Sequence, residues 1–206
     1  MKKNLIDYWK NIKLVKDKKI IEAFKKVDRE EFVLDEFKHK AYSDIALPII
    51  AGQTISQPTT IMIMTQTLEP KENDKILEIG AGSGYQAALL SYLCKKVYTI
   101  ERLPELVSFA RHNLNRANIK NVEVIEGDGT LGYEKEAPYD KIIVTAASPK
   151  IPKALIEQLK ENGIIVIPVG ASFSCRMIKA EKIKGKLKEE FLGYFSFVPL
   201  IGKEGY

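Results

Sequence analysis

Residues 75–85 are Lys75-Ile76-Leu77-Glu78-Ile79-Gly80-Ala81-Gly82-Ser83-Gly84-Tyr85. A short β-rich run ends at Ile79, a glycine-rich loop follows it, and a stretch with helical character begins at Tyr85. This order is typical of open parallel sheets, which bind ligands beyond the carboxyl ends of their strands. Glycines in the loop allow positive φ angles and a close approach of the backbone to a ligand, although similar clusters also make tight turns that bind nothing.

Strands and helices alternate beyond this stretch. Four further β-rich runs occur at residues 96–100, 122–125, 141–145 and 164–167. Helical stretches lie between the strands at residues 85–93, 104–117 and 152–159. Such alternation requires crossover connections, which predict a parallel sheet with helices on both faces.

The alternation stops after Gly170. Residues 173–183 and 187–198 are β-leaning and flank Lys184-Gly185, a pattern that predicts an antiparallel hairpin at one end of the sheet. The predicted fold class is therefore α/β, with a doubly wound, mostly parallel sheet of seven strands and a C-terminal antiparallel hairpin.

The N-terminal part differs from this core. Residues 1–40 predict two short helices, and Asp17 is a plausible cap of the second. Residues 41–57 lose the helical period but are unusually apolar for a surface loop, so we expect them to cover another part of the protein. Pro58 suits the first turn of a helix that ends near Pro70. We expect one domain, residues 1–206, built from an N-terminal extension (1–57), an α/β core (58–170) and the hairpin (171–206).

Composition and charge exclude several classes of protein. The 206 residues are 45% hydrophobic and 29% charged, as in ordinary globular domains. Residues 1–40 carry 12 basic and 8 acidic side chains and residues 171–206 carry 7 and 4, so the excess positive charge of +5 lies at the two ends. This distribution argues against a basic nucleic-acid groove through the middle. No run approaches the roughly 18 apolar residues of a membrane helix, and a signal peptide is lacking, so we expect a cytoplasmic protein. The two cysteines have no metal-binding spacing, and we predict no metal.

Two acidic residues extend the predicted ligand site. Glu101 ends the second strand, 21 positions after Gly80 (101 − 80), where a carboxylate can accept from both hydroxyls of a ribose. Asp128 follows the third strand, where it can accept from an adenine amino group while Gly129 leaves room for the ring. Either acid could instead be a solvated loop charge or a helix cap.

The electrostatics of the loop favours one class of nucleoside ligand. A pyrophosphate site prefers G-x-G-x-x-G and a positive environment, whereas this loop has glycines at 80, 82 and 84 and no basic residue. A sulfonium cofactor carries a cation and no phosphate, and an acid-rich site that includes Glu78 suits it better. S-adenosylmethionine, with S-adenosylhomocysteine as its product, is therefore the leading candidate.

At these residues the chain resembles the protein-L-isoaspartate (D-aspartate) O-methyltransferases, a family of class I S-adenosylmethionine-dependent methyltransferases. The resemblance covers residues 40 to 170 closely. Besides the glycine loop it rests on Asp44-Ile45-Ala46-Leu47-Pro48-Ile49, Ala51-Gly52-Gln53-Thr54-Ile55-Ser56, Glu126-Gly127-Asp128-Gly129, Ala137-Pro138-Tyr139-Asp140, residues 152–159 and Pro168-Val169-Gly170. Many methyltransferases share the glycine loop, whereas residues 52–56 are particular to this family.

The resemblance implies a Rossmann-like fold and methyl transfer to the free α-carboxylate of isoaspartyl residues, the first step of their repair. It assigns the active-site role to Ser56 and substrate contacts to Gln53, Thr54, Ile55 and Ser56. Cofactor contacts are implied for Glu78, Gly80, Ala81, Gly82, Ser83, Gly84, Glu101, Asp128 and Gly129. Family members commonly have Ala-Pro-His after the serine, whereas this chain has Gln57-Pro58-Thr59, so the resemblance implies no contact from that histidine here.

The chemistry is compatible with a chain that has only two histidines. A carboxylate is already ionised at neutral pH, so its attack on a sulfonium methyl group needs no general base. Ser56 can orient this carboxylate, although a serine just before Pro58 could instead cap the helix that follows. Because the substrate is defined by its main chain, we expect few side-chain-specific contacts.

Three other functions share some of these features. A nucleic-acid methyltransferase has the same cofactor fold, but its Asn/Asp-Pro-Pro-aromatic run is replaced here by Thr145-Ala146-Ala147-Ser148-Pro149, and neither cysteine follows a proline. A nicotinamide-dependent oxidoreductase and a non-catalytic sensor of an adenosyl ligand also remain as alternatives. We expect isoaspartyl peptides and proteins as partners of a monomer, with no nucleic acid and no membrane.

Overall fold

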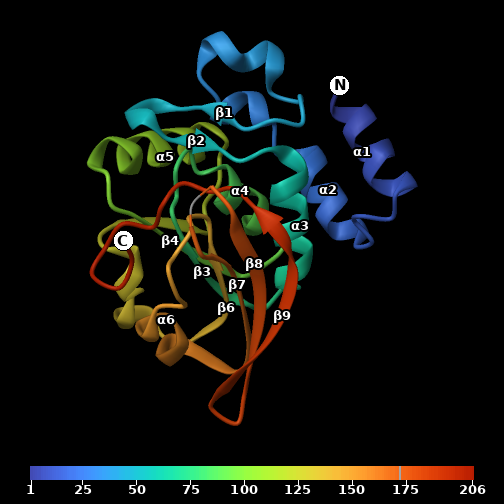
Figure 1. Cartoon of the computed structure of the whole chain (residues 1–206). Coiled ribbons are helices and arrows are strands. Elements are labelled where there is room, and N and C mark those ends of the chain that lie inside the picture. Colours follow the sequence, from blue (N-terminus) through green and yellow to red (C-terminus); the bar gives the residue numbers. More distant parts are fainter. Residues whose placement is uncertain (172) are drawn as a thin grey trace.

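The central sheet has seven strands in the order β5-β4-β3-β6-β7-β8-β9. The computed structural model describes residues 1–171 and 173–206. The strands are β3 (Lys75–Ile79), β4 (Lys96–Glu101), β5 (Val122–Glu126), β6 (Tyr139–Val144), β7 (Leu159–Val169), β8 (Cys175–Ile183) and β9 (Lys186–Phe195). Neighbouring strands from β5 to β7 pair in parallel, whereas β8 and β9 are antiparallel additions. The predicted fold class is confirmed (Figure 1).

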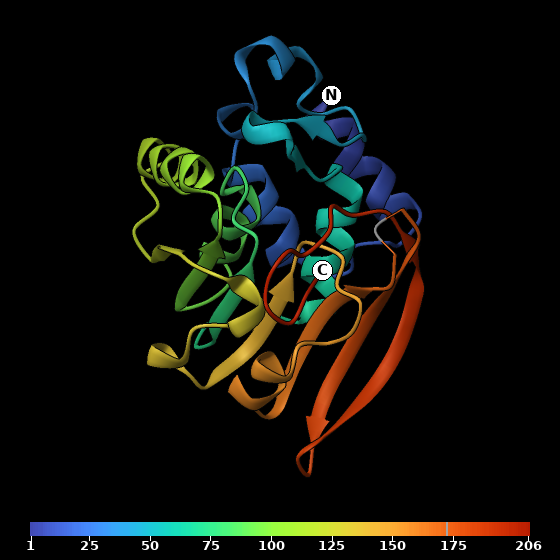
Figure 2. The same ribbon diagram turned by 60° about the vertical axis from the view of Figure 1, so that its left-hand side comes forward.

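Helices cover both faces of this sheet. The main helices of the core are α3 (Pro58–Leu68), α4 (Tyr85–Ser91), α5 (Pro104–Arg116) and α6 (Lys153–Gln158). Alternate residues of β3 point to opposite faces: Ile76 packs in one cluster with Met64 of α3, and Leu77 packs in another with Leu155 of α6. Because the inner strands are apolar on both faces, the sheet is stable only between two helical layers (Figure 2).

The N-terminal layer lies against α4. It consists of α1 (Lys2–Asn11) and α2 (Lys18–Lys26), followed by short 3-10 helices at Arg29–Phe32 and Asp35–Lys40 that the sequence did not predict. Asp17 caps α2 by accepting from the Lys19 amide at 2.7 Å, as expected. The apolar segment that follows is a miniature hairpin, in which β1 (Leu47–Pro48) pairs with β2 (Thr54–Ile55) around a 3-10 turn at Ile50–Gly52.

A buried arginine of the N-terminal layer contacts an aromatic ring of the core. The Arg29 side chain is fully buried, and its guanidinium carbon lies 5.2 Å from the centre of the Tyr85 ring. Its nitrogens have no hydrogen-bond partner among the described residues. Burial lowers the pKa of Arg29 to about 10, so the group stays charged at neutral pH.

The C-terminal hairpin turns at Lys184-Gly185, where both residues have positive φ angles, 50° and 74°. This confirms the turn predicted from the sequence. Among residues 1–171 and 173–206, no helix is long and apolar enough to cross a membrane. Both cysteines are buried, Cys94 just before β4 and Cys175 at the start of β8.

Candidate active site

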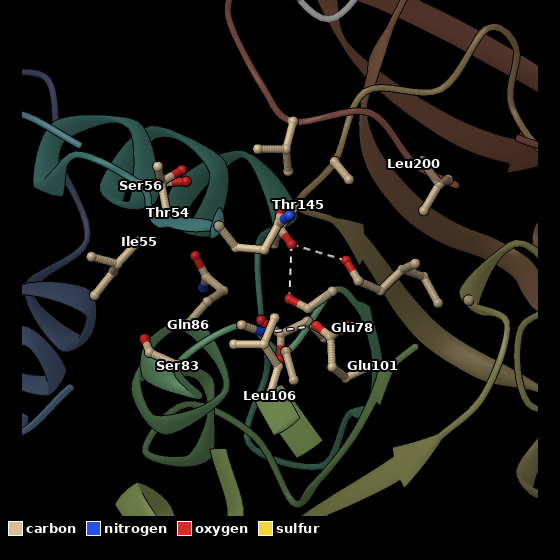
Figure 3. A pocket seen from close by; sticks show the side chains of 18 of the residues that line it. Thr54, Ile55, Ser56, Glu78, Ser83, Gln86, Glu101, Leu106, Thr145 and Leu200 are labelled. Atoms are coloured by element: carbon tan, nitrogen blue, oxygen red, sulfur yellow. Dashed lines mark hydrogen bonds between the residues drawn. The ribbon is translucent and has the colours of Figure 1, made fainter. Parts of the chain in front are cut away.

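One pocket lies at the carboxyl ends of β3, β4 and β6 (Figure 3). The β2–α3 segment, with residues 53–56, forms one wall, and the glycine loop with the end of β4 forms the opposite one. Residues 198–201, which follow β9, close a third side. The pocket therefore brings together the predicted substrate segment and the predicted cofactor loop, which lie far apart in the sequence.

The glycine loop has a conformation that glycine alone adopts easily. Gly80, Gly82 and Gly84 have φ angles of 94°, 53° and 86°. A Cβ atom on Gly80 would lie 2.5 Å from the Thr145 hydroxyl oxygen, which donates to the Gly80 carbonyl at 2.8 Å. Gly84 does not border the pocket but permits close packing of α4 against Leu114 of α5. The loop is thus fixed both by its own backbone conformation and by the side chain of Thr145, the residue that follows β6.

Glu101 is held in place by three backbone amides. One carboxylate oxygen accepts from Gly82 at 3.1 Å, and the other accepts from Arg102 at 2.8 Å and from Leu103 at 3.1 Å. The side chain is mostly buried and borders the pocket. A carboxylate has about four acceptor sites, so this arrangement leaves one for a ligand hydroxyl.

Glu78 lies deeper and has no partner. Its side chain is fully buried at the base of the pocket, and neither carboxylate oxygen accepts a hydrogen bond from a described residue. Burial raises the pKa of Glu78 to about 8; the neighbouring Thr99 hydroxyl opposes this shift, and the charge of Glu101 adds to it. A buried carboxyl group without a partner is costly. A ligand that brings positive charge or donor groups would remove this cost.

Gly129 borders the pocket, whereas the neighbouring Asp128 is not among the residues that line it. Its carboxylate accepts from the amide and the hydroxyl of Thr130, at 2.9 and 2.7 Å, and from the Lys203 amide at 2.8 Å. Burial would raise the pKa of Asp128, but these donors hold it below the usual value. The cap that the sequence left as an alternative is therefore present, and a contact with adenine stays a prediction.

Unlike the carboxylates of Glu101 and Asp128, the Ser56 hydroxyl is not held by hydrogen bonds to the described residues. It does not cap α3: the N-cap position is Gln57, which makes no capping bond, and Asp44 instead accepts from the Thr59 amide at 2.8 Å. The Thr59 hydroxyl donates to Asp44 at 2.6 Å and accepts from Trp9 at 2.7 Å. Thr59 thus has a structural role at the position where the family commonly has histidine. Within residues 1–171 and 173–206, the Ser56 hydroxyl is left without a hydrogen bond and borders the pocket.

Some residues of the site were not predicted from the sequence. Thr145, at the end of the fourth strand, could have been found because parallel strand ends meet at one edge of the sheet. Gln86, whose amide donates to Thr65 at 3.0 Å, borders the pocket from the first turn of α4. Residues 198–201 carry no local signal, because only tertiary folding brings them to the pocket.

Comparison with known proteins agrees with this geometry. The family described as protein-L-isoaspartate(D-aspartate) O-methyltransferase (PCMT) matches residues 1–205. A protein-L-isoaspartate O-methyltransferase of Methanoculleus marisnigri is 45% identical over 205 residues, which are 100% of this chain and 93% of the relative. One from Pyrococcus abyssi is 47% identical over 196 residues, 94% of this chain and 91% of the relative.

Solved structures are also similar. A protein-L-isoaspartate O-methyltransferase superposes with a TM-score of 0.90 at 27% identity, covering 100% of this chain and 67% of that one. A structure from Plasmodium falciparum, a complex with S-adenosyl-L-homocysteine, has a TM-score of 0.84 at 24% identity and covers 97% of both chains. At that identity the second likeness supports the fold alone.

Proposed function

Because this chain belongs to the protein-L-isoaspartate(D-aspartate) O-methyltransferase family, we infer that its pocket performs methyl transfer in the repair of damaged proteins. The enzyme transfers a methyl group from S-adenosylmethionine to the free α-carboxylate of isoaspartyl residues in peptides and proteins. The observation that carries this function is the single pocket that joins Ser56 to the glycine loop and Glu101. Both reactants need to meet there.

The residues present fit this cofactor. Glycine loop residues 80–84 offer a close approach, Glu101 keeps an acceptor for the ribose, and the unpartnered Glu78 suits a cationic ligand. Gly129 borders the pocket, and a Cβ atom there would lie 2.4 Å from Ile79, so only glycine fits at this position beside the end of β3. When bound, S-adenosylmethionine supplies a methyl group activated by a positively charged sulfur. We assign the adenine contact to Asp128, whose carboxylate keeps an acceptor site besides its three bonds.

Ser56 and the hairpin around it position the substrate. The Ser56 hydroxyl donates to the α-carboxylate and holds one oxygen toward the methyl group, while Gln53, Thr54 and Ile55 line the path of the peptide. This carboxylate is ionised at neutral pH, so no residue needs to remove a proton. Apolar side chains that border the pocket, among them Ile55, Ile61 and Met64, exclude water from the carboxylate, which makes its oxygen more reactive. Positioning of this kind supplies several kcal/mol of barrier reduction, up to about 7 to 11 in ideal cases.

A methyl-transfer assay tests this function. The purified protein is incubated with labelled S-adenosylmethionine and either an isoaspartyl peptide or its aspartyl twin of the same sequence. We expect methylation of the isoaspartyl peptide alone. Equal methylation of both peptides, or of RNA instead, would overturn the assignment, and calorimetric binding of NAD in place of S-adenosylhomocysteine would favour an oxidoreductase.

We also propose that the enzyme works as a monomer in the cytoplasm, as one domain in which residues 1–57 and 171–206 flank the cofactor-binding core. The uneven charge distribution, with the basic excess at the two ends of the chain, supports a partner other than nucleic acid. Sedimentation velocity at micromolar concentration distinguishes a monomer from a dimer.

A further inference from the structure

An exposed aromatic cluster lies at the edge of the sheet. Phe191 and Tyr194 of β9 meet edge to face with their ring centres 5.2 Å apart, and the Arg176 guanidinium lies 5.4 Å from the Phe191 ring. Tyr194 is 69% exposed and Phe191 is 47% exposed. Phe173, in the loop between β7 and β8, is 81% exposed. We call these four residues the edge patch.

A β-bulge creates this cluster. Arg176 pairs with Tyr194 and Ile178 pairs with Phe191, so three steps along β9 correspond to two along β8. Gly193, with a φ angle of 127°, lies in the extra step. In a regular strand, residues three positions apart point to opposite faces. The bulge instead turns Tyr194 to the side of Phe191, and bulges of this kind re-aim side chains near functional sites.

The edge patch lies close to the active site. β9 runs parallel to β7 (Figure 1). Its last residues therefore lie at the same end of the sheet as the carboxyl ends of β3, β4 and β6, where the pocket lies. The Ser196 hydroxyl donates to the Phe173 carbonyl at 2.9 Å, which joins the loop to the chain that leaves β9. Tyr194 is only four positions before Val198, which borders the pocket, a span of at most about 14 Å.

The edge strand β9 is favourable for pairing with another chain only along its C-terminal half. β9 is the last strand of the sheet, so its outer backbone groups have no partner strand in the described chain. Lys186, Lys188, Glu189 and Glu190 protect its first half, since charges on an edge strand oppose association. From Phe191 to Phe195 the strand carries no charge. The uncharged half is the one next to the pocket.

We propose that the edge patch binds the polypeptide that flanks the isoaspartyl residue of the substrate. This rests on the proposed function, because that substrate is an extended chain whose main chain continues beyond the reacting carboxylate. The flanking segment pairs with the free edge of β9 through its backbone, and its apolar side chains contact Phe173, Phe191 and Tyr194. Such contacts tolerate many sequences, which suits an enzyme that acts on damage in unrelated proteins.

The test compares substrates of two lengths. One is a four-residue isoaspartyl peptide, and the other has the same centre in a peptide of about sixteen residues with apolar flanks, whose arms each reach about 25 Å. In the double variant Phe191→Ser with Tyr194→Ser, we expect the KM of the long peptide to rise about tenfold. The KM of the short peptide and kcat for both should stay unchanged. The single variant Tyr194→Phe should behave like the native enzyme.

A matched control uses a second exposed aromatic residue. Tyr92 follows α4 at the opposite end of the sheet, is 45% exposed and has the Lys26 ammonium group 5.3 Å from its ring. Tyr92→Ser should leave the KM of both peptides unchanged.

Three results would overturn the proposal. An equal rise of KM for both peptides would mean that the edge patch supports the pocket, and equal KM values of the native enzyme for both would mean that no flanking site exists. A native dimer that the double variant dissociates would assign the patch to a second copy of the chain. If the native enzyme methylates neither peptide, the proposed function itself fails.

Discussion

The two walls of the pocket are held in opposite ways. On the cofactor side, Glu101 accepts from three amides and the Thr145 hydroxyl fills the space beside Gly80. On the substrate side, the backbone is fixed by Asp44 at the start of α3, while the Ser56 hydroxyl is free among the described residues. The wall to which we assign one invariant small molecule is, apart from Glu78, held by hydrogen bonds within the protein. The wall that meets many polypeptides fixes its main chain and leaves its donor available.

The largest effect is expected when one glycine of the cofactor wall is compared with one from the hairpin turn that precedes the substrate wall. In Gly80→Ala, the new Cβ atom would lie 2.5 Å from the Thr145 oxygen at a φ angle of 94°. We expect a loss of about 2 to 4 kcal/mol of stability together with loss of S-adenosylhomocysteine binding by calorimetry. Gly52→Ala has no atom within 4 Å of the new Cβ and should cost about 1 kcal/mol from its positive φ alone. Equal melting temperatures of the two variants would contradict the comparison.

Removal of the acid on the cofactor wall should have the next largest effect. Glu101→Ala leaves the amides of Gly82, Arg102 and Leu103 without their acceptor. We expect the KM for S-adenosylmethionine to rise about thirtyfold, with the KM for the peptide unchanged. Glu101→Gln keeps one acceptor oxygen and should lose less. A peptide KM that rises in parallel would show that the walls are not independent.

On the substrate wall, Ser56→Ala should act on rate alone. We expect kcat to fall about tenfold because the carboxylate loses its orienting donor. The melting temperature and the affinity for S-adenosylhomocysteine should stay the same, since the hydroxyl makes no bond within the described fold. A lower melting temperature, seen by calorimetry, would show that the serine has a structural role after all.

A last test concerns stability alone and the exception on the cofactor wall, Glu78. Its folded-state pKa of about 8 lies above its ordinary value of 4.5, so the folded protein binds more protons than the unfolded chain between these pH values. The ligand-free protein should therefore lose stability as the pH rises through this window. Glu78→Gln removes this dependence and should melt several degrees higher than the native protein at pH 8. Parallel curves for both proteins from pH 5 to 8 would disprove the assignment.

Much of the α/β core could be predicted from hydrophobic periodicity and from the residues at the ends of strands. The stretch 75–85 predicted a strand, a loop and a helix, because its apolar runs and glycines each act locally. The end of β4 likewise predicted where Glu101 would lie. Long-range contacts were not predictable in this way. The hydrogen bond from Lys203 to Asp128 joins residues 75 positions apart, and nothing in either local sequence indicates it. The hairpin of residues 47–55 was missed because its strands are only two residues long.

The two buried cysteine thiols can serve as chemical probes of local unfolding. Burial raises the pKa of Cys94 to about 12 and also raises that of Cys175, so neither forms the reactive thiolate at neutral pH. Cys175 donates to the Phe195 carbonyl at 3.0 Å, between β8 and β9, whereas Cys94 lies just before β4, near the opposite edge of the sheet. Alkylation of each thiol can proceed only when its surroundings separate. The relative rates of the two reactions would then report whether the hairpin of β8 and β9 detaches before the half of the sheet that contains β4 unfolds.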